Sequence, residues 1–166
     1  TFDMLIMRIM DGFLAIPSIL LAIALVSLTE ASIQNVIIAI TVSEIPRVVR
    51  LSRSVVLTIR DQPYVDAAIV SGCRQVKIIY RHILPNSLAP IIVQATFICA
   101  SAIIIESALS FLGAGTPPEI PSWGNMIAEG RSYFQLAPWI ILFPGLFLAL
   151  LILSVNLLGD GLRDML

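Results

Sequence analysis

The chain has 166 residues, of which 58% are hydrophobic and 13% charged, and its mean hydropathy is +0.96. This composition excludes an ordinary soluble globular domain and favours one membrane domain over 1–166, an all-α bundle of transmembrane helices in a lipid bilayer. The length allows about four spans of roughly 20 residues each. The net charge of −1 gives no reason to expect a nucleic-acid partner.

Four apolar segments follow one another along the chain and are predicted to span the membrane. They cover roughly 13–28, 33–42 with an amphipathic helical extension to 59, 88–112, and 137–158. Pro17 lies near the start of the first segment, and Pro144-Gly145 predicts a kink in the last. The chain begins at Thr1 without a signal-peptide pattern, so we interpret it as N-terminally incomplete.

The polar loop 61–85, between the second and third segments, contains a predicted short helix. Asp61-Gln62-Pro63 is typical of a helix start, because an acidic residue and a proline both suit the first turn. Leu84-Pro85 predicts the end of the helical segment, since proline disfavours helical backbone in the residue before it. The loop is therefore expected to form a short helix between two membrane spans.

Basic residues are concentrated in one part of the chain. Most of the ten lysines and arginines lie between 47 and 81, and Arg8 and Arg163 flank the first and last segments. Because positive residues remain in the cytoplasm, we expect both ends of the chain and the 61–85 loop to be cytoplasmic. The 113–136 loop is then extracytoplasmic, and an even number of spans satisfies this orientation.

Asp66-Ala67-Ala68, followed by Gly72 and then Leu84-Pro85, resembles the cytoplasmic signature loop of ABC-transporter permeases. Its small residues leave a helix, 66–72, that the backbone of another protein can approach closely. The resemblance implies a coupling helix that contacts a separate ATPase, with the coupling residues Asp66, Ala67, Ala68, Gly72, Leu84 and Pro85. Two positions differ from the usual pattern: Asp66 replaces a glutamate, and His82 replaces an aliphatic residue.

Further motifs resemble the dipeptide/oligopeptide/nickel branch of these permeases. They are Ser110-Phe111-Leu112-Gly113, Pro121-Ser122-Trp123-Gly124 and the stretch 156–164. The chain is similar to the C-terminal portion of the second permease type of that branch. The resemblance implies an inner-membrane importer with two permease subunits, two ATP-binding subunits and an extracytoplasmic substrate-binding protein. It leaves dipeptides, oligopeptides, nickel and glutathione open as substrates.

The sequence contains no nucleotide-binding motif: there is no G-x-x-x-x-G-K-[ST] loop and no Gly-Lys pair. We therefore expect ATP and Mg²⁺ on the partner ATPase, and no cofactor, metal site or enzymatic activity in this chain. His82 is the single histidine and lies in no cluster of metal-ligating residues. Two alternatives remain open: a secondary transporter driven by an ion gradient, and a membrane scaffold that transports nothing.

Glu106 is the candidate pathway residue, because it lies inside an otherwise apolar segment. Placing an ionisable side chain within a membrane costs free energy, so such side chains usually face the interior of a helix bundle or a water-filled cavity. One hypothesis is that Glu106 lines the translocation pathway near its outer end. The alternative is a structural hydrogen bond to Ser107, to Ser110 or to a neighbouring helix.

Arg47, Arg50 and Arg53 recur at every third residue, as in a voltage sensor. Snorkelling to cytoplasmic headgroups is the simpler interpretation of these long side chains. Glu44 can pair with Arg47 at i,i+3, which is typical of a solvated or interfacial helix face.

In the 113–136 loop, Ser122 predicts the cap of a short helix over 123–129 that ends at Gly130. Trp123, Met126 and Ile127 share one side of this helix, which is therefore expected to lie along the membrane interface. The resemblance implies that this loop also covers the pathway and meets the substrate-binding protein.

Overall fold

The structure is a computed structural model that describes residues 2–29 and 32–165, and the regular structure of those residues is helical throughout. The elements are, in chain order, α1 (Phe2–Leu14), α2 (Ser18–Ser27), α3 (Ile33–Arg60), α4 (Pro63–Val70), α5 (Gln75–Ile78), the π-helix η1 (Ile79–Ile83), α6 (Leu84–Phe111), α7 (Trp123–Gly130), the 3-10 helix η2 (Arg131–Tyr133) and α8 (Trp139–Met165). The predicted all-α fold is confirmed.

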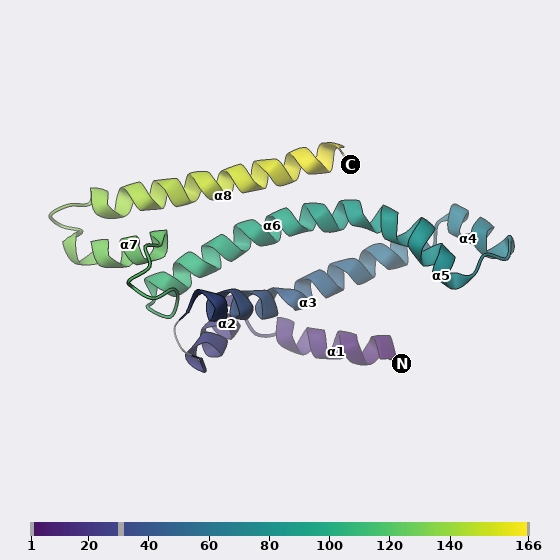
Figure 1. Cartoon of the computed structure of the whole chain (residues 1–166), viewed down its shortest axis with the longest axis horizontal. Helices are drawn as coiled ribbons and strands as arrows, with labels where there is room; N and C mark the ends of the chain where they lie inside the picture. The colour runs from purple at the N-terminus through teal and green to yellow at the C-terminus, as the bar shows by residue number, and fades with distance from the viewer. Residues whose placement is uncertain (1, 30–31, 166) are drawn as a thin grey trace.

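The central element of the bundle is α6, which contacts α3 along one side and α8 along another (Figure 1). The two short helices α1 and α2 pack against α3, and α7 packs against α6 and α8. A small apolar core joins three helices; its members are Ala22 and Val26 of α2, Val36, Ala39 and Ile40 of α3, and Ile105 and Leu109 of α6. Large apolar side chains elsewhere on the long helices are exposed, as expected for surfaces that face lipid.

Two helical stretches among the described residues are long and apolar enough to cross a membrane: Gln75–Phe111 and Trp139–Met165. A third candidate exists if α1 and α2, which meet at an angle of 86°, are one broken span. The count of four spans is therefore not confirmed, because α3 is apolar only in its first half. The last stretch continues without interruption through Pro144-Gly145, where the sequence predicts a kink.

Two ion pairs attach α1 to α3. The Arg53 guanidinium donates through Nε and Nη2 to the two carboxylate oxygens of Asp3, each at 2.7 Å. Arg50 donates through Nη2 to Oδ1 of Asp11. Arg50 and Arg53 thus each have an acidic partner on α1.

Leu84-Pro85 does not end the helical segment, so that prediction is wrong. The helix runs on from α5 through η1 into α6 as one stretch of 37 residues. In η1 the backbone widens to a π turn, and the N–H of Leu84 donates to the carbonyl of Ile79 five residues earlier. A wider turn accommodates the proline ring and its missing N–H, which an unbroken α-helix would not.

Candidate functional sites: the 61–85 loop and the α3–α6 groove

The 61–85 loop lies at the end of the molecule opposite α7 (Figure 1). The helix α4 starts at Pro63, as predicted, with Gln62 as its N-cap in an extended conformation. Asp61 instead caps the C-terminus of α3. Only Asp61 and Gln62 therefore separate α3 from α4, so the two helices are closely connected.

The end of α4 shows why residue 72 is a glycine. The helix stops at Val70, so the prediction that it extends to Gly72 is wrong. Gly72 has φ +76° and donates its N–H to Ile69, while Cys73 donates to Ala68. This pair of bonds is a Schellman motif, which needs a left-handed residue and favours glycine there. A Cβ on Gly72 would meet none of the described atoms within 4 Å, so the backbone conformation, and no crowding, requires glycine.

The surface of α4 is apolar and exposed. Val65 is buried and anchors the helix, and a tilted contact between the rings of Tyr64 and His82 ties it to η1. On the outer surface, Ala67 is exposed, and the side chains of Ile69 and Val70 are 55% and 89% exposed. Exposed apolar side chains on a polar loop indicate a surface that contacts another molecule.

The predicted coupling residues divide into two sets in the structure. Asp66, Ala67 and Ala68 lie on α4, and Gly72 lies in the turn that follows it. Leu84 and Pro85 are exposed in the first turn of α6, after α5 and η1 have led the chain away from α4.

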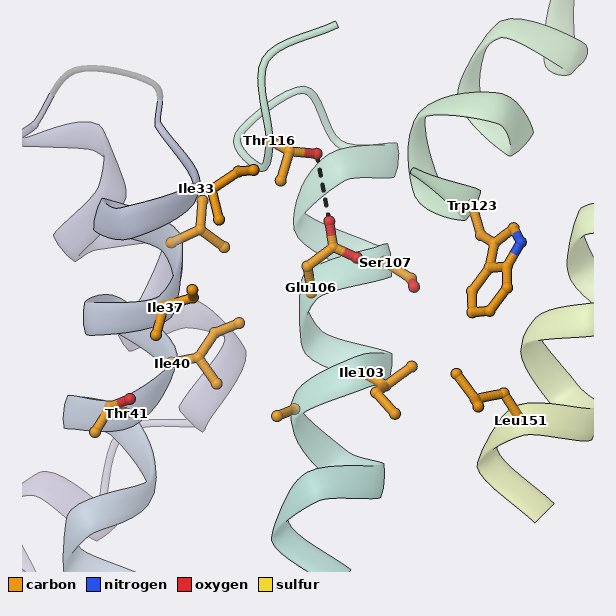
Figure 2. A pocket seen from close by; sticks show the side chains of 12 residues that line it. Ile33, Ile37, Ile40, Thr41, Ile103, Glu106, Ser107, Thr116, Trp123 and Leu151 are labelled. Atoms are coloured by element: carbon orange, nitrogen blue, oxygen red, sulfur yellow. Dashed lines mark hydrogen bonds between the residues drawn. The ribbon is translucent and has the colours of Figure 1, made fainter. Parts of the chain in front are cut away.

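Glu106 lines a cavity of about 390 Å³ between α3 and α6. Figure 2 shows its side chain between the isoleucines of α3 on one side and Trp123 on the other. Its Oε1 accepts hydrogen bonds from the hydroxyl of Ser110 at 2.7 Å and from that of Thr116 at 3.4 Å. The predicted hydrogen bond to Ser110 is therefore present, and Glu106 also lines a cavity.

The 113–136 loop folds tightly over the α7 end of this cavity. The amide of Asn125 donates to the carbonyls of Pro117 and Ile120, which holds the loop closed on itself. Gly124 is pressed against α6: a Cβ there would lie 2.4 Å from the carbonyl oxygen of Ser107. The loop thus brings Trp123 and Thr116 into the cavity lining.

The predicted short helix in this loop is present as α7. The hydroxyl of Ser122 accepts the N–H of Asn125 at 3.1 Å, which is the expected N-cap bond. Gly130 is the last residue of α7 rather than the residue after it.

A second cavity of about 370 Å³ lies further along α3 and α6, and Glu44 lines it. Glu44 is 4% exposed, and neither of its carboxylate oxygens accepts a hydrogen bond from a described residue. The i,i+3 pair with Arg47 is present at 3.3 Å, but the face of α3 that carries Glu44 is buried. The interpretation of this pair as a solvated helix face is therefore wrong for Glu44.

All of the chain, residues 1–166, matches one protein family, described as Binding-protein-dependent transport system inner membrane component. The chain belongs to this family. It is 56% identical over 165 residues to a probable peptide ABC transporter permease of Sinorhizobium fredii, which covers 99% of the chain and 57% of that relative. It is 50% identical over 162 residues to a dipeptide transport system permease of Alkalihalophilus pseudofirmus (98% of the chain, 53% of the relative).

A dipeptide transport system permease of Escherichia coli is 44% identical over 160 residues, which cover 96% of the chain and 53% of the relative. The chain thus spans a little over half the length of these curated relatives. The resemblance to the second permease type of the peptide branch is confirmed.

Glu44 is the residue of this permease chain that sequence reasoning missed. A signal for it exists: Val36, Ile40 and Glu44 recur every four residues, so they share one face of α3. Since Val36 and Ile40 belong to the apolar core, Glu44 is carried inward with them.

Proposed function

We propose that this chain is the membrane-spanning part of a permease subunit in an ATP-driven importer of peptides. The observation that carries the proposal is the family match over all 166 residues, together with the peptide permeases among the relatives. In this function the chain contributes to the translocation pathway and hydrolyses nothing itself. Two ATP-binding subunits, a second permease subunit and a substrate-binding protein complete the transporter, and ATP and Mg²⁺ bind to the ATP-binding subunits.

We infer that α4 is the helix on which an ATP-binding subunit docks. Its exposed apolar surface, Ala67 with Ile69 and Val70, supports this assignment, because such a surface gains free energy when a protein covers it. The basic residues of the 61–85 loop and of the second half of α3 support a cytoplasmic position, where ATP is available.

The connections of α4 support a mechanical function. It follows α3 after two residues and leads through the Gly72 turn into the continuous helix Gln75–Phe111. These two helices are also the walls of the groove that Glu44 and Glu106 line. A rigid-body displacement of α4 by the ATPase therefore moves both walls of the groove, as alternating access requires.

The opposite end of the groove is assigned to the outside of the membrane. The 113–136 loop covers that end, and only Arg131 contributes a basic residue to it. We propose that this loop receives the peptide from the substrate-binding protein.

Purification of the full-length protein from its native membrane in mild detergent tests the assembly. We expect a Walker-motif ATPase and a second permease among the co-purifying chains identified by mass spectrometry. In a background in which serine replaces the free cysteines Cys73 and Cys99, a cysteine in place of Ala67 should cross-link to the ATPase with a short bifunctional reagent. A cysteine in place of Leu136, which is exposed in the loop at the opposite end, should not. A chain that purifies without an ATPase in several detergents would favour a gradient-driven carrier or a scaffold.

A further inference from the structure

We propose that the α3–α6 groove binds the protonated N-terminal amino group of a peptide, and that Glu44 and Glu106 are its two anionic contacts. The proposal rests on the proposed function, because it assigns the substrate chemistry of the same pathway. It adds Glu44, which no sequence motif identifies as a pathway residue.

The two cavities are adjoining parts of one groove. Both are lined by Ile40 and Thr41 of α3 and by Ala102 of α6. The helices run antiparallel (Figure 1), so Glu44 and Glu106 lie on opposite sides of these shared residues. Each carboxylate is about one turn away from them, which separates the two by about 12 Å along the groove. The groove therefore has two acidic positions in series.

Glu44 has unused capacity to accept hydrogen bonds. Both of its oxygens are buried, and neither accepts a hydrogen bond from a described residue. Its neighbour Arg47 reaches Oε2 at 3.3 Å from outside the groove, with its own side chain 47% exposed. Burial of a carboxylate without hydrogen bonds costs free energy, which a bound cationic donor would recover.

The hydrogen bonding of the Glu106 carboxylate is also incomplete. The hydrogen bonds that described residues make to it, from Ser110 and Thr116, both end on Oε1. The second oxygen of this side chain is left for a ligand in the cavity.

The lining of the groove favours an organic ammonium over a metal ion or an anion. No lysine, arginine or histidine of the described chain lines either cavity, so an anionic group would meet only repulsion. The described residues also contain no group of three or more metal-ligating side chains, and carboxylates about 12 Å apart cannot share one ion. An ammonium needs only one carboxylate, and the isoleucine and valine walls suit the apolar side chains of a peptide.

The test is calorimetric titration of the purified transporter, with its permease and ATPase partners but without the substrate-binding protein. The ligands are an apolar dipeptide and the same dipeptide acetylated at its amino terminus. We expect the free dipeptide to bind at least tenfold more tightly than the acetylated one. Glu44→Gln should remove most of this preference and Glu106→Gln should reduce it. Asp160→Asn, which neutralises an exposed carboxylate on α8 that lines neither cavity, should leave the preference intact.

Equal binding of the two dipeptides to the wild-type complex, or no binding of either, would overturn the proposal. So would an unchanged preference in both glutamine variants, provided that they co-purify with their partners as the wild type does. ATP-driven uptake with the substrate-binding protein, measured in parallel, separates the two levels of inference. Normal uptake without selective binding overturns only the groove assignment, whereas absent uptake overturns the proposed function as well.

Discussion

The 61–85 loop exposes apolar side chains, whereas the α3–α6 groove buries a charged one, Glu44. On α4, Val70 is almost fully exposed in a segment that we assign to the aqueous phase. In the groove, Glu44 is buried between helices whose other lining residues are largely apolar. Each arrangement costs free energy in the isolated chain, so each indicates a partner: a protein surface on α4 and a cationic ligand in the groove.

The largest expected effect comes from a bulky residue on the exposed surface of α4. Ala67→Trp should abolish ATP-driven uptake, at least about a hundredfold, because the indole ring prevents close approach of the ATPase. The helix itself should form normally, since Ala67 is exposed and the anchor Val65 is unchanged. Uptake into reconstituted vesicles measures the effect, and Met165→Trp, at an exposed position on α8, is the matched control. Wild-type uptake by the Ala67 variant would remove α4 from the coupling mechanism.

The second largest effect is expected in the 113–136 loop, which covers one end of the groove. Gly124→Ala places a methyl group 2.4 Å from the Ser107 carbonyl, so the 113–136 loop must move away from α6. We expect a loss of roughly 1–3 kcal/mol in stability, as for other overpacked sites. Thermal unfolding in detergent measures it. Gly145→Ala is the control, since a Cβ there meets none of the described atoms within 4 Å; equal melting of the two variants would contradict the close contact.

Substitutions of Gly72 test whether this position needs glycine for its backbone conformation or for close contact with the ATPase. Gly72→Ala should cost about 1–2 kcal/mol, because an L-residue other than glycine is strained in the left-handed region. Gly72→Asn should cost less despite its larger side chain, since asparagine tolerates that conformation. Thermal unfolding and uptake of both variants give the order. If uptake instead falls with side-chain size, from alanine to asparagine, Gly72 acts as a contact for the ATPase.

The smallest effect is expected at the ion pairs between α1 and α3. Arg53→Ala and Asp3→Ala should each lower stability only slightly, because the side chains of Arg53 and Asp3 are 41% and 61% exposed. In a double-mutant cycle at low ionic strength, the coupling energy should be favourable and should decline as salt is added. A coupling that is insensitive to salt would indicate that the pair is shielded from water.

Local signals in the sequence predicted local structure well. Pro63 and Ser122 each mark a helix start because their effects involve only the next few residues. Leu84-Pro85 misled the prediction, because the rule for the residue before proline does not include a π turn just upstream that accommodates the ring.

The groove was harder to predict because it is made by pairs of distant segments. The cavity that Glu44 lines is completed by residues of α6 such as Ile98 and Ala102, which lie far from it in the sequence. The i,i+3 neighbour of Glu44, Arg47, instead favoured a solvated face, and only the tertiary packing of α3 on α6 decides between the two. Glu106 could be predicted as a candidate because a single carboxylate in an apolar segment is conspicuous without any knowledge of its neighbours.

The central claim is that movement of α4 by an ATPase opens and closes a groove between α3 and α6. Its most direct test is peptide uptake by proteoliposomes that contain the full-length protein, its permease and ATPase partners, and the substrate-binding protein. We predict uptake that requires ATP on the side of the membrane that carries the ATP-binding subunits. This uptake should stop with vanadate and should be lost in Ala67→Trp. Uptake that proceeds without ATP, or that an ion gradient alone supports, would contradict the account.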